Sequence, residues 1–299
     1  MGTIRNPIEW SAERLVNGGQ WLGEVGRAAR GEAHGDDARI TVHRITTADL
    51  RAALAAGMDD LMALRSDVIA LCLLYPVVGL LATAAFNYTV LPLLFPTVAG
   101  FAILGPFFAV GLYELSRRRE KGLETGWRHA LDIVASPSFG AIMLLGLGLL
   151  AMFVVWILLA QILYDLTLGP AQPISAREFA ERVLTEQAGW VLTVVGIALG
   201  GVFALVALIG AAISFPLMVD RDVGVRPAVA TSIRLFRENP VTVLTWGAVV
   251  AGLLALGMLP AFLGLVFVLP LLGHATWHLY RRAVTVGEPV AGHGEATGG

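Results

Sequence analysis

Charge is scarce in this 299-residue sequence, in which only 15% of the residues are Asp, Glu, Lys or Arg while 56% are hydrophobic. Soluble domains carry about 25% charged residues, so the composition excludes an ordinary soluble protein. Four long stretches contain no charged residue at all, namely 68–113, 139–163, 190–219 and 241–280. Because about 20 apolar residues in a helix cross a bilayer, these stretches predict an all-α, polytopic membrane protein.

Cysteine and catalytic motifs are also missing. The one cysteine, Cys72, lies inside an apolar run, which excludes a disulfide framework and a CxxC site. The motifs of zinc peptidases, serine hydrolases, P-loop proteins and dinucleotide-binding folds do not occur. A formal net charge of −2 gives no indication of a nucleic-acid partner. We therefore expect a protein that is not an enzyme and has no catalytic residues.

The lengths of the charge-free stretches predict six transmembrane helices. The first stretch is too long for one span and divides at Asn87-Tyr88, and the last divides near Leu259-Pro260. The other two stretches are single spans. The six predicted spans are about 68–86, 90–113, 139–163, 190–219, 241–258 and 261–280.

The parts of the chain outside the spans divide it into three regions. Residues 1–46 are expected to form a cytoplasmic N-terminal segment that is partly disordered, chiefly over 30–44. A single six-helix membrane domain follows over 47–286, and residues 287–299 are expected to be a disordered tail. Both disordered parts are rich in glycine, alanine and charge, and such segments cannot bury enough apolar surface to fold.

Basic residues are distributed unevenly between the two sides of the predicted bundle. Six spans place both termini on one side, and the segments on that side carry nineteen of the 21 Lys and Arg residues. The other side has only Arg177 and Arg182, in the loop 164–189. Because basic loops stay on the cytoplasmic side, we expect both termini in the cytoplasm. In the outer loop, Ser175 and Glu178 form a capping box, which predicts a short helix.

A short amphipathic segment precedes each odd-numbered span, with apolar residues at relative positions 0, 4, 8 and 11. This spacing covers one face of a helix, so we predict three cytoplasmic helices in the interface plane. Breaks at 65–67, 136–137 and 239–240 are expected to separate these helices from the spans. The chain is therefore predicted to contain three hairpin repeats. The predicted apolar faces are Leu50, Leu54, Met58 and Leu61; Leu123, Trp127, Leu131 and Val134; and Val225, Val229, Ile233 and Phe236.

Two histidines, His274 and His278, lie in the last charge-free stretch, within the sequence GHATWHLYRR. Four residues apart, they share one face of the predicted helix. Aromatic and basic anchors at a helix end account for His278, and a hydrogen bond within the bundle accounts for His274. A haem or metal role is the weaker alternative, with His129 as the third residue of a metal site. We expect no cofactor and no metal.

Several stretches of the chain resemble a proteobacterial family of predicted integral membrane proteins of unknown function. They are TIRNPIEW, RSDVIALCLLYPVVGL, LPLLFPTVAGFAILGPFFAVGLYELSRRRE, SFPLMVDRDVGV and GHATWHLYR. The SFPLMVDRDVG portion is also similar, distantly, to the membrane region of membrane-bound glycerophosphodiesterases, whose catalytic domain this chain lacks. The resemblance implies the bacterial inner membrane and no agreed activity.

These features favour a non-enzymatic scaffold, assembly, regulatory or lipid-contacting module of the inner membrane. The expected partners are the lipid bilayer and either another membrane protein or further copies of the chain. Two alternatives remain open from the sequence. One is an uncoupled small-molecule transporter or channel, and the other is a haem- or metal-binding redox subunit that uses His274.

Overall fold

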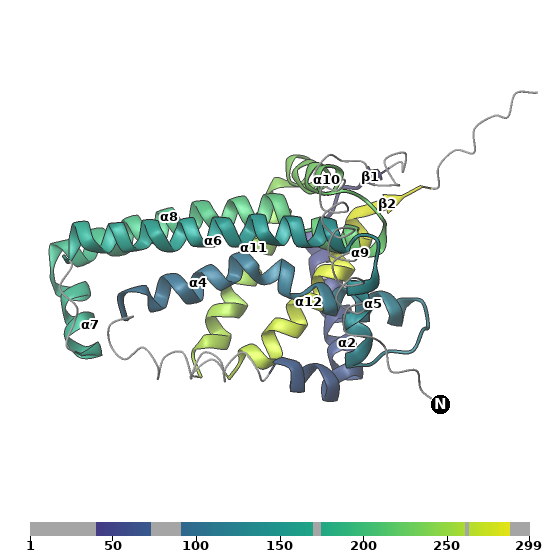
Figure 1. The fold of residues 1–299 in the computed structure, drawn as a ribbon, viewed down its shortest axis with the longest axis horizontal. Helices are drawn as coiled ribbons and strands as arrows, with labels where there is room; N and C mark the ends of the chain where they lie inside the picture. The colour runs from purple at the N-terminus through teal and green to yellow at the C-terminus, as the bar shows by residue number, and fades with distance from the viewer. Residues whose placement is uncertain (1–39, 73–90, 170–174, 261–262, 288–299) are drawn as a thin grey trace, which may run out of the picture.

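The computed structural model describes residues 40–72, 91–169, 175–260 and 263–287. Helices dominate these residues, as predicted, and one two-stranded sheet accompanies them (Figure 1). In chain order the elements are β1 (Ile40–Val42), α2 (Thr47–Cys72), α4 (Leu91–Phe108), α5 (Val110–Glu120), η2 (Trp127–Ala135), α6 (Phe139–Thr167), α7 (Ala176–Thr185), α8 (Gln187–Ala211), α9 (Ser214–Asp220), α10 (Val225–Glu238), α11 (Pro240–Met258), α12 (Leu265–Ala283) and β2 (Val284–Val286).

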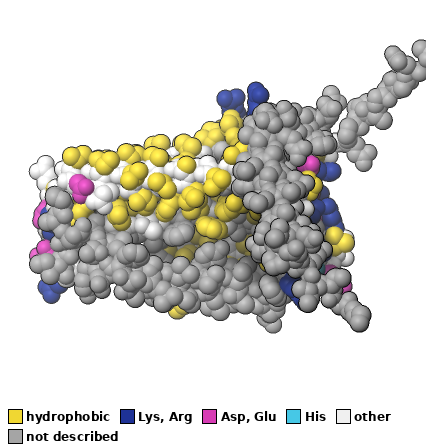
Figure 2. All heavy atoms as spheres, in the orientation of Figure 1, with side chains coloured by type: hydrophobic (Ala, Val, Ile, Leu, Met, Phe, Trp, Pro, Cys, Tyr) yellow, Lys and Arg dark blue, Asp and Glu magenta, His cyan; other side chains and the backbone are white. Residues whose placement is uncertain are grey.

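Three stretches of the described chain are long and apolar enough to cross a membrane: Phe139–Thr167, Gln187–Asp220 and Pro240–Met258. The helices α6 and α8 pack side by side, and Figure 2 shows hydrophobic side chains along their outer surface. Exposed apolar surfaces of this length mark contact with a membrane or a partner. Large exposed side chains on them include Leu158, Ile162, Val194, Ile197 and Val202.

Helix boundaries differ from the prediction in three places. The predicted span 90–113 is divided at Ala109 between α4 and α5. The helix α2 continues from Thr47 to Cys72, so the expected break at 65–67 is wrong. None of those three residues is Gly or Pro, and polar side chains alone do not end a helix. The predicted span 190–219 is divided between α8 and α9. Pro216 lacks the N–H that would bond to the carbonyl of Ala212, which accounts for this second interruption.

The N-terminal and C-terminal parts of the described chain are joined at the end of the protein where α5, α9, α10 and the sheet lie (Figure 1). This end is called the polar end below. The strand β1 pairs antiparallel with β2, and Ile40 lies opposite Val286. The buried Asn239 side chain accepts a hydrogen bond from the Ile45 N–H at 2.8 Å and donates one to the His43 carbonyl at 3.1 Å. The expectation of disorder over 30–44 is therefore wrong from residue 40 onward. Residues 1–39, 73–90 and 288–299 lie outside the described residues.

The amphipathic segments adopt different environments. The helix α2 buries Leu50 and Leu61 as predicted but exposes Met58. The helix α10 buries a face displaced from the predicted one, which includes Ala228 and Leu235. The middle segment forms the 3-10 helix η2 instead of an α-helix. Three residues of the predicted apolar face of this segment are exposed: Leu123, which precedes η2, and Leu131 and Val134, which lie on it.

The predicted short helix in the outer loop is confirmed. It is α7, and the Ser175 hydroxyl accepts a hydrogen bond from the Glu178 N–H at 3.1 Å. Figure 1 shows α7 at one end of α6 and α8, whereas α5, α9, α10 and the sheet lie at the other end. The polar parts of the fold are therefore separated by the length of the apolar helices.

A close contact between α2 and α12 fixes the geometry of the polar end. A Cβ atom placed on Gly57 would lie only 2.6 Å from the backbone nitrogen of Ala275. Because a backbone atom cannot move aside as a flexible side chain can, Gly57 allows the two helices to approach this closely. The contacts between α2 and α12 are the most extensive between any two described elements.

We predict that Gly57→Ala destabilises the protein by about 1–3 kcal/mol, because the added methyl group overpacks this helix crossing. The measurement is the free energy of unfolding in mixed micelles. Gly148→Ala, on α6, is the matched control, since nothing lies within 4 Å of a Cβ atom at Gly148. It should leave stability unchanged or raise it by up to about 1 kcal/mol. Equal effects of the two substitutions would contradict this view of the crossing.

Candidate functional site

A buried polar cluster joins α2, α5 and α12 at the polar end. The Ser116 hydroxyl donates a hydrogen bond to Asp60 Oδ2 at 2.6 Å and lies 2.7 Å from His274 Nδ1. His278 Nε2 lies 2.9 Å from the same carboxylate oxygen, and Arg119 donates to the other oxygen, Oδ1. Helical spacing explains the arrangement, because residues three or four apart share a face on α5 and on α12.

The hydrogen-bond pattern determines which ring nitrogen of His274 carries the proton. Ser116 has a single hydroxyl proton, which it donates to Asp60. The Nδ1 atom of His274 must therefore carry the proton in its contact with Ser116. The side chain of His274 has no exposed surface, and its Nε2 atom has no hydrogen-bond partner among the described residues. His274 is thus held in place from one side of the ring only.

Asp60 remains ionised in this cluster although it is only 2% exposed. Burial by itself raises the pKa of a carboxyl group because it disfavours the charged form. Hydrogen bonds from His278, Ser116 and Arg119 favour the charged form more strongly, so the pKa of Asp60 falls from 3.8 to about 2. The carboxylate is therefore a fixed negative charge that holds three helices together.

The structure places the two predicted histidines together and explains what the sequence analysis missed. Both surround Asp60, which was not identified from the sequence. Its position three residues after Gly57 puts it on the packed face of α2, and this spacing is the signal that could have found it. Among the described residues no group of three or more His, Cys, Asp or Glu side chains is arranged to hold a metal ion. His129, on η2, therefore does not complete a three-histidine site.

We predict that Asp60→Asn lowers the free energy of unfolding at pH 7 by about 2 kcal/mol, because it removes charge-assisted hydrogen bonds. The folded-state pKa of Asp60 is depressed, so its contribution is fully present above about pH 4 and is lost as pH falls from 3.8 to about 2. Chemical unfolding in micelles at pH 7 and at pH 3 measures both effects.

The exposed neighbour provides the matched control for this substitution. Asp59 lies on the outer side of α2, so Asp59→Asn should change neither the stability at pH 7 nor its pH dependence. Equal losses in the two variants would mean that the Asp60 carboxylate does not hold the helices together.

A surface cavity lies beside this cluster, between α5, η2 and the turn that joins α9 to α10. Its volume is about 340 Å³. Its wall carries groups of both charges together with hydroxyl groups. The residues that define it here are Arg117, Arg118, Asp132, Ser138, Arg221 and Asp222.

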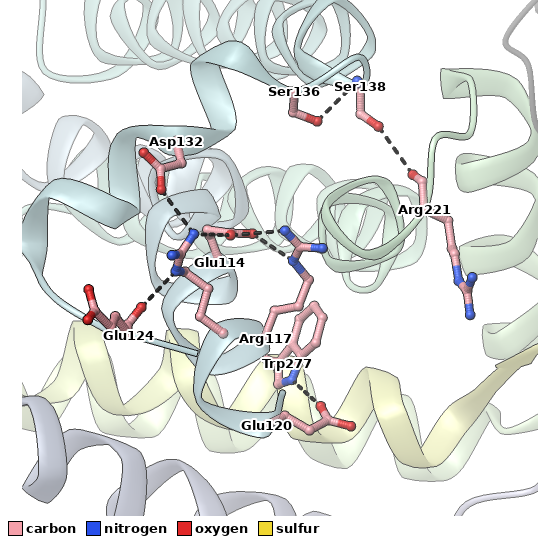
Figure 3. A network of polar contacts seen from close by, with 10 residues as sticks. Glu114, Arg117, Glu120, Glu124, Asp132, Ser136, Ser138, Arg221 and Trp277 are labelled. Carbon is pink, nitrogen blue, oxygen red and sulfur yellow. Dashed lines mark hydrogen bonds and ion pairs between the residues drawn. The ribbon is translucent and has the colours of Figure 1, made fainter. Parts of the chain in front are cut away.

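Ion pairs within the chain hold the arginine side of the cavity in place (Figure 3). Arg117 binds the buried Glu114 carboxylate in a two-pronged contact, with distances of 2.7 Å from Nε and 2.9 Å from Nη2. Arg118 reaches across to Asp132 on η2, 3.0 Å away, and also donates to the Glu124 carbonyl. The contact of Arg118 with Asp132 links α5 to η2, and together these bonds orient both guanidinium groups at the cavity wall.

The opposite wall comes from the turn between α9 and α10. The Ser138 hydroxyl, just before α6, donates to the Arg221 carbonyl at 3.2 Å (Figure 3). The same hydroxyl lies 3.5 Å from Asp222 Oδ1. This contact connects the start of α6 to the turn. The cavity wall thus presents charges of both signs beside hydroxyl groups.

Comparison with known proteins agrees with the membrane character of the fold. Residues 93–220 match the model of a family described as a predicted integral membrane protein (DUF2189). The matched part, less than half of the chain, runs from α4 to α9 and contains Arg117 and Arg118 of the cavity. Searches of the curated proteins and of the solved structures found no match. The chain is an integral membrane protein with several apolar helices.

Proposed function

We propose that the protein is a non-enzymatic, lipid-contacting module of the bacterial inner membrane, with six spans, three hairpin repeats and both termini in the cytoplasm. The observation that carries the proposal is the outward apolar face of η2. Leu131 is 60% exposed and Val134 57% exposed, directly before the long apolar helix α6 begins. An exposed apolar face at the start of a span is suited to the boundary between headgroups and acyl chains.

Basic residues lie close to this apolar face in the sequence. The last turn of α5 contains Arg117, Arg118 and Arg119, Lys121 follows the helix, and Arg128 is exposed on η2 itself. Each basic residue near an anionic membrane surface contributes about 1 kcal/mol of attraction. Apolar insertion and electrostatic attraction would then act together at the same end of the molecule. This combination favours contact with lipid over a freely solvated surface.

The arrangement of the helix ends supports the repeat and the orientation. The elements α5, α9 and α12, which end the three predicted hairpins, pack against one another. Arg281 on α12 lies 3.4 Å from Asp220 on α9, so charged groups also meet there. The helix α7 lies at the opposite end of α6 and α8 (Figure 1). Three hairpins whose exits meet on the basic side are consistent with cytoplasmic termini.

The depth of η2 in a bilayer tests this function. We predict that a fluorescent label on Leu131→Cys is quenched by brominated acyl chains, because this side chain faces the lipid. Cys72→Ala provides the background without a native thiol. The matched control is Arg128→Cys on the same helix, where an exposed basic residue should lie in water and escape quenching. If both labels are accessible only to aqueous quenchers, η2 does not contact the membrane and the proposal fails.

A further inference from the structure

We propose that the cavity between α5, η2 and the α9–α10 turn binds the zwitterionic headgroup of an amino-phospholipid of the phosphoethanolamine type. In this pose the phosphate lies against Arg117 and Arg118, and the primary ammonium lies against Asp222. The inference rests on the proposed function, because it requires the cavity to open at the level of the lipid headgroups. Its volume of about 340 Å³ is within the range of small-molecule sites.

The arginine side of the cavity has the donors that a phosphate needs. Arg117 uses two of its five N–H groups for Glu114, and Arg118 uses two for Asp132 and the Glu124 carbonyl. These bonds hold the planar guanidinium groups in fixed orientations and leave other N–H groups on each. Arginine binds phosphate oxygens with two parallel hydrogen bonds, which a point charge such as lysine cannot do.

The opposite wall has the acceptor that an ammonium group needs. Asp222 is half-buried and forms no ion pair with any described residue. Among those residues, the one polar partner of its side chain is the Ser138 hydroxyl, 3.5 Å from Oδ1. The neighbouring Asp220, by contrast, is already bonded to Tyr280 and Arg281. A primary ammonium has three N–H donors and no acceptor, so a carboxylate is its natural partner.

The mixed charge of the wall favours a zwitterion over a simple ion. A lone phosphate would face the carboxylates of Asp132 and Asp222, and a lone cation would face three arginines. A headgroup with both charges can place each against its opposite.

The position of the cavity favours a lipid over a soluble zwitterion. Ser136, Pro137 and Ser138 line the cavity, and the apolar helix α6 begins at the next residue, Phe139. The cavity therefore lies where a span would enter the membrane. Ile133 of η2 also lines it, while Leu131 and Val134 of the same helix face outward. A headgroup in the cavity would leave its acyl chains beside this apolar face.

Native mass spectrometry of the full-length protein in detergent tests the site. The probes are phosphatidylethanolamine, phosphatidylcholine and phosphatidylglycerol with identical acyl chains. The wild type should retain phosphatidylethanolamine best. Asp222→Asn should weaken its binding about tenfold, the effect of one charge-assisted hydrogen bond, and leave phosphatidylglycerol binding unchanged. Arg118→Gln should weaken the binding of all three lipids. Arg128→Gln changes a basic residue outside the cavity and should leave phosphatidylethanolamine binding unchanged.

The outcomes separate this site from the function on which it rests. Equal retention of the three lipids by the wild type, or an unchanged preference in Asp222→Asn, would overturn the site. Displacement of the lipid by an equal concentration of glycerophosphoethanolamine would overturn its assignment to a lipid. Circular dichroism confirms that each variant is folded. If the label on Leu131→Cys is quenched by lipid but no headgroup preference is found, only the site fails. If the label on Leu131→Cys lies in water, the proposed function and the site both fail.

Discussion

The polar end of the protein depends on how the Asp60 carboxylate is held between α2, α5 and α12. Transfer of a charge into a protein interior costs several kcal/mol unless hydrogen bonds replace the lost water. Here Ser116 and Arg119 from α5 and His278 from α12 supply those bonds. The contact is possible because Gly57, one turn earlier on α2, allows the α12 backbone to approach. One carboxylate and one glycine thus fix the positions of three helices.

The position of α5 then determines the surface around it. Ser116 and Arg119 point to the buried cluster, whereas Arg117 and Arg118 bind Glu114 and Asp132 beside the cavity. The same short helix therefore stabilises the interior and presents the arginines. Any change in how α5 packs on α12 would move the cavity wall relative to η2. Through this helix, the buried cluster would influence the lipid contacts that we propose.

Apolar length and capping were sufficient to predict the main helices, because they depend on local sequence. The charge-free stretches anticipated α6 and α11, and Ser175 anticipated α7. The middle amphipathic segment forms a helix, η2, but its 3-10 form was not predicted, and its contact with lipid stays a prediction. Local sequence was insufficient where tertiary packing decides. The strand β1 exists because it pairs with β2, more than 240 residues later in the chain.

The candidate site shows the same limit. The two histidines were conspicuous in an apolar stretch, but their partner Asp60 lies more than 200 residues away and was not identified from the sequence. The spacing of Gly57 and Asp60 places both on one face of α2, but one sequence does not show which distant helix packs on that face and buries Asp60. The cavity was not anticipated for a similar reason. Its wall comes from three segments that meet only in the folded chain.

The most direct test of the central claim is the sidedness of the two ends of the bundle. Single cysteines replace Glu181 on α7 and Lys121 after α5, both exposed, in the Cys72→Ala background. A membrane-impermeant maleimide is applied to spheroplasts before and after permeabilisation. The account predicts that Glu181→Cys is labelled in intact spheroplasts and Lys121→Cys only after permeabilisation. Labelling of both positions from the same side, or the reverse pattern, would contradict a bundle whose basic end rests on the cytoplasmic face of the membrane.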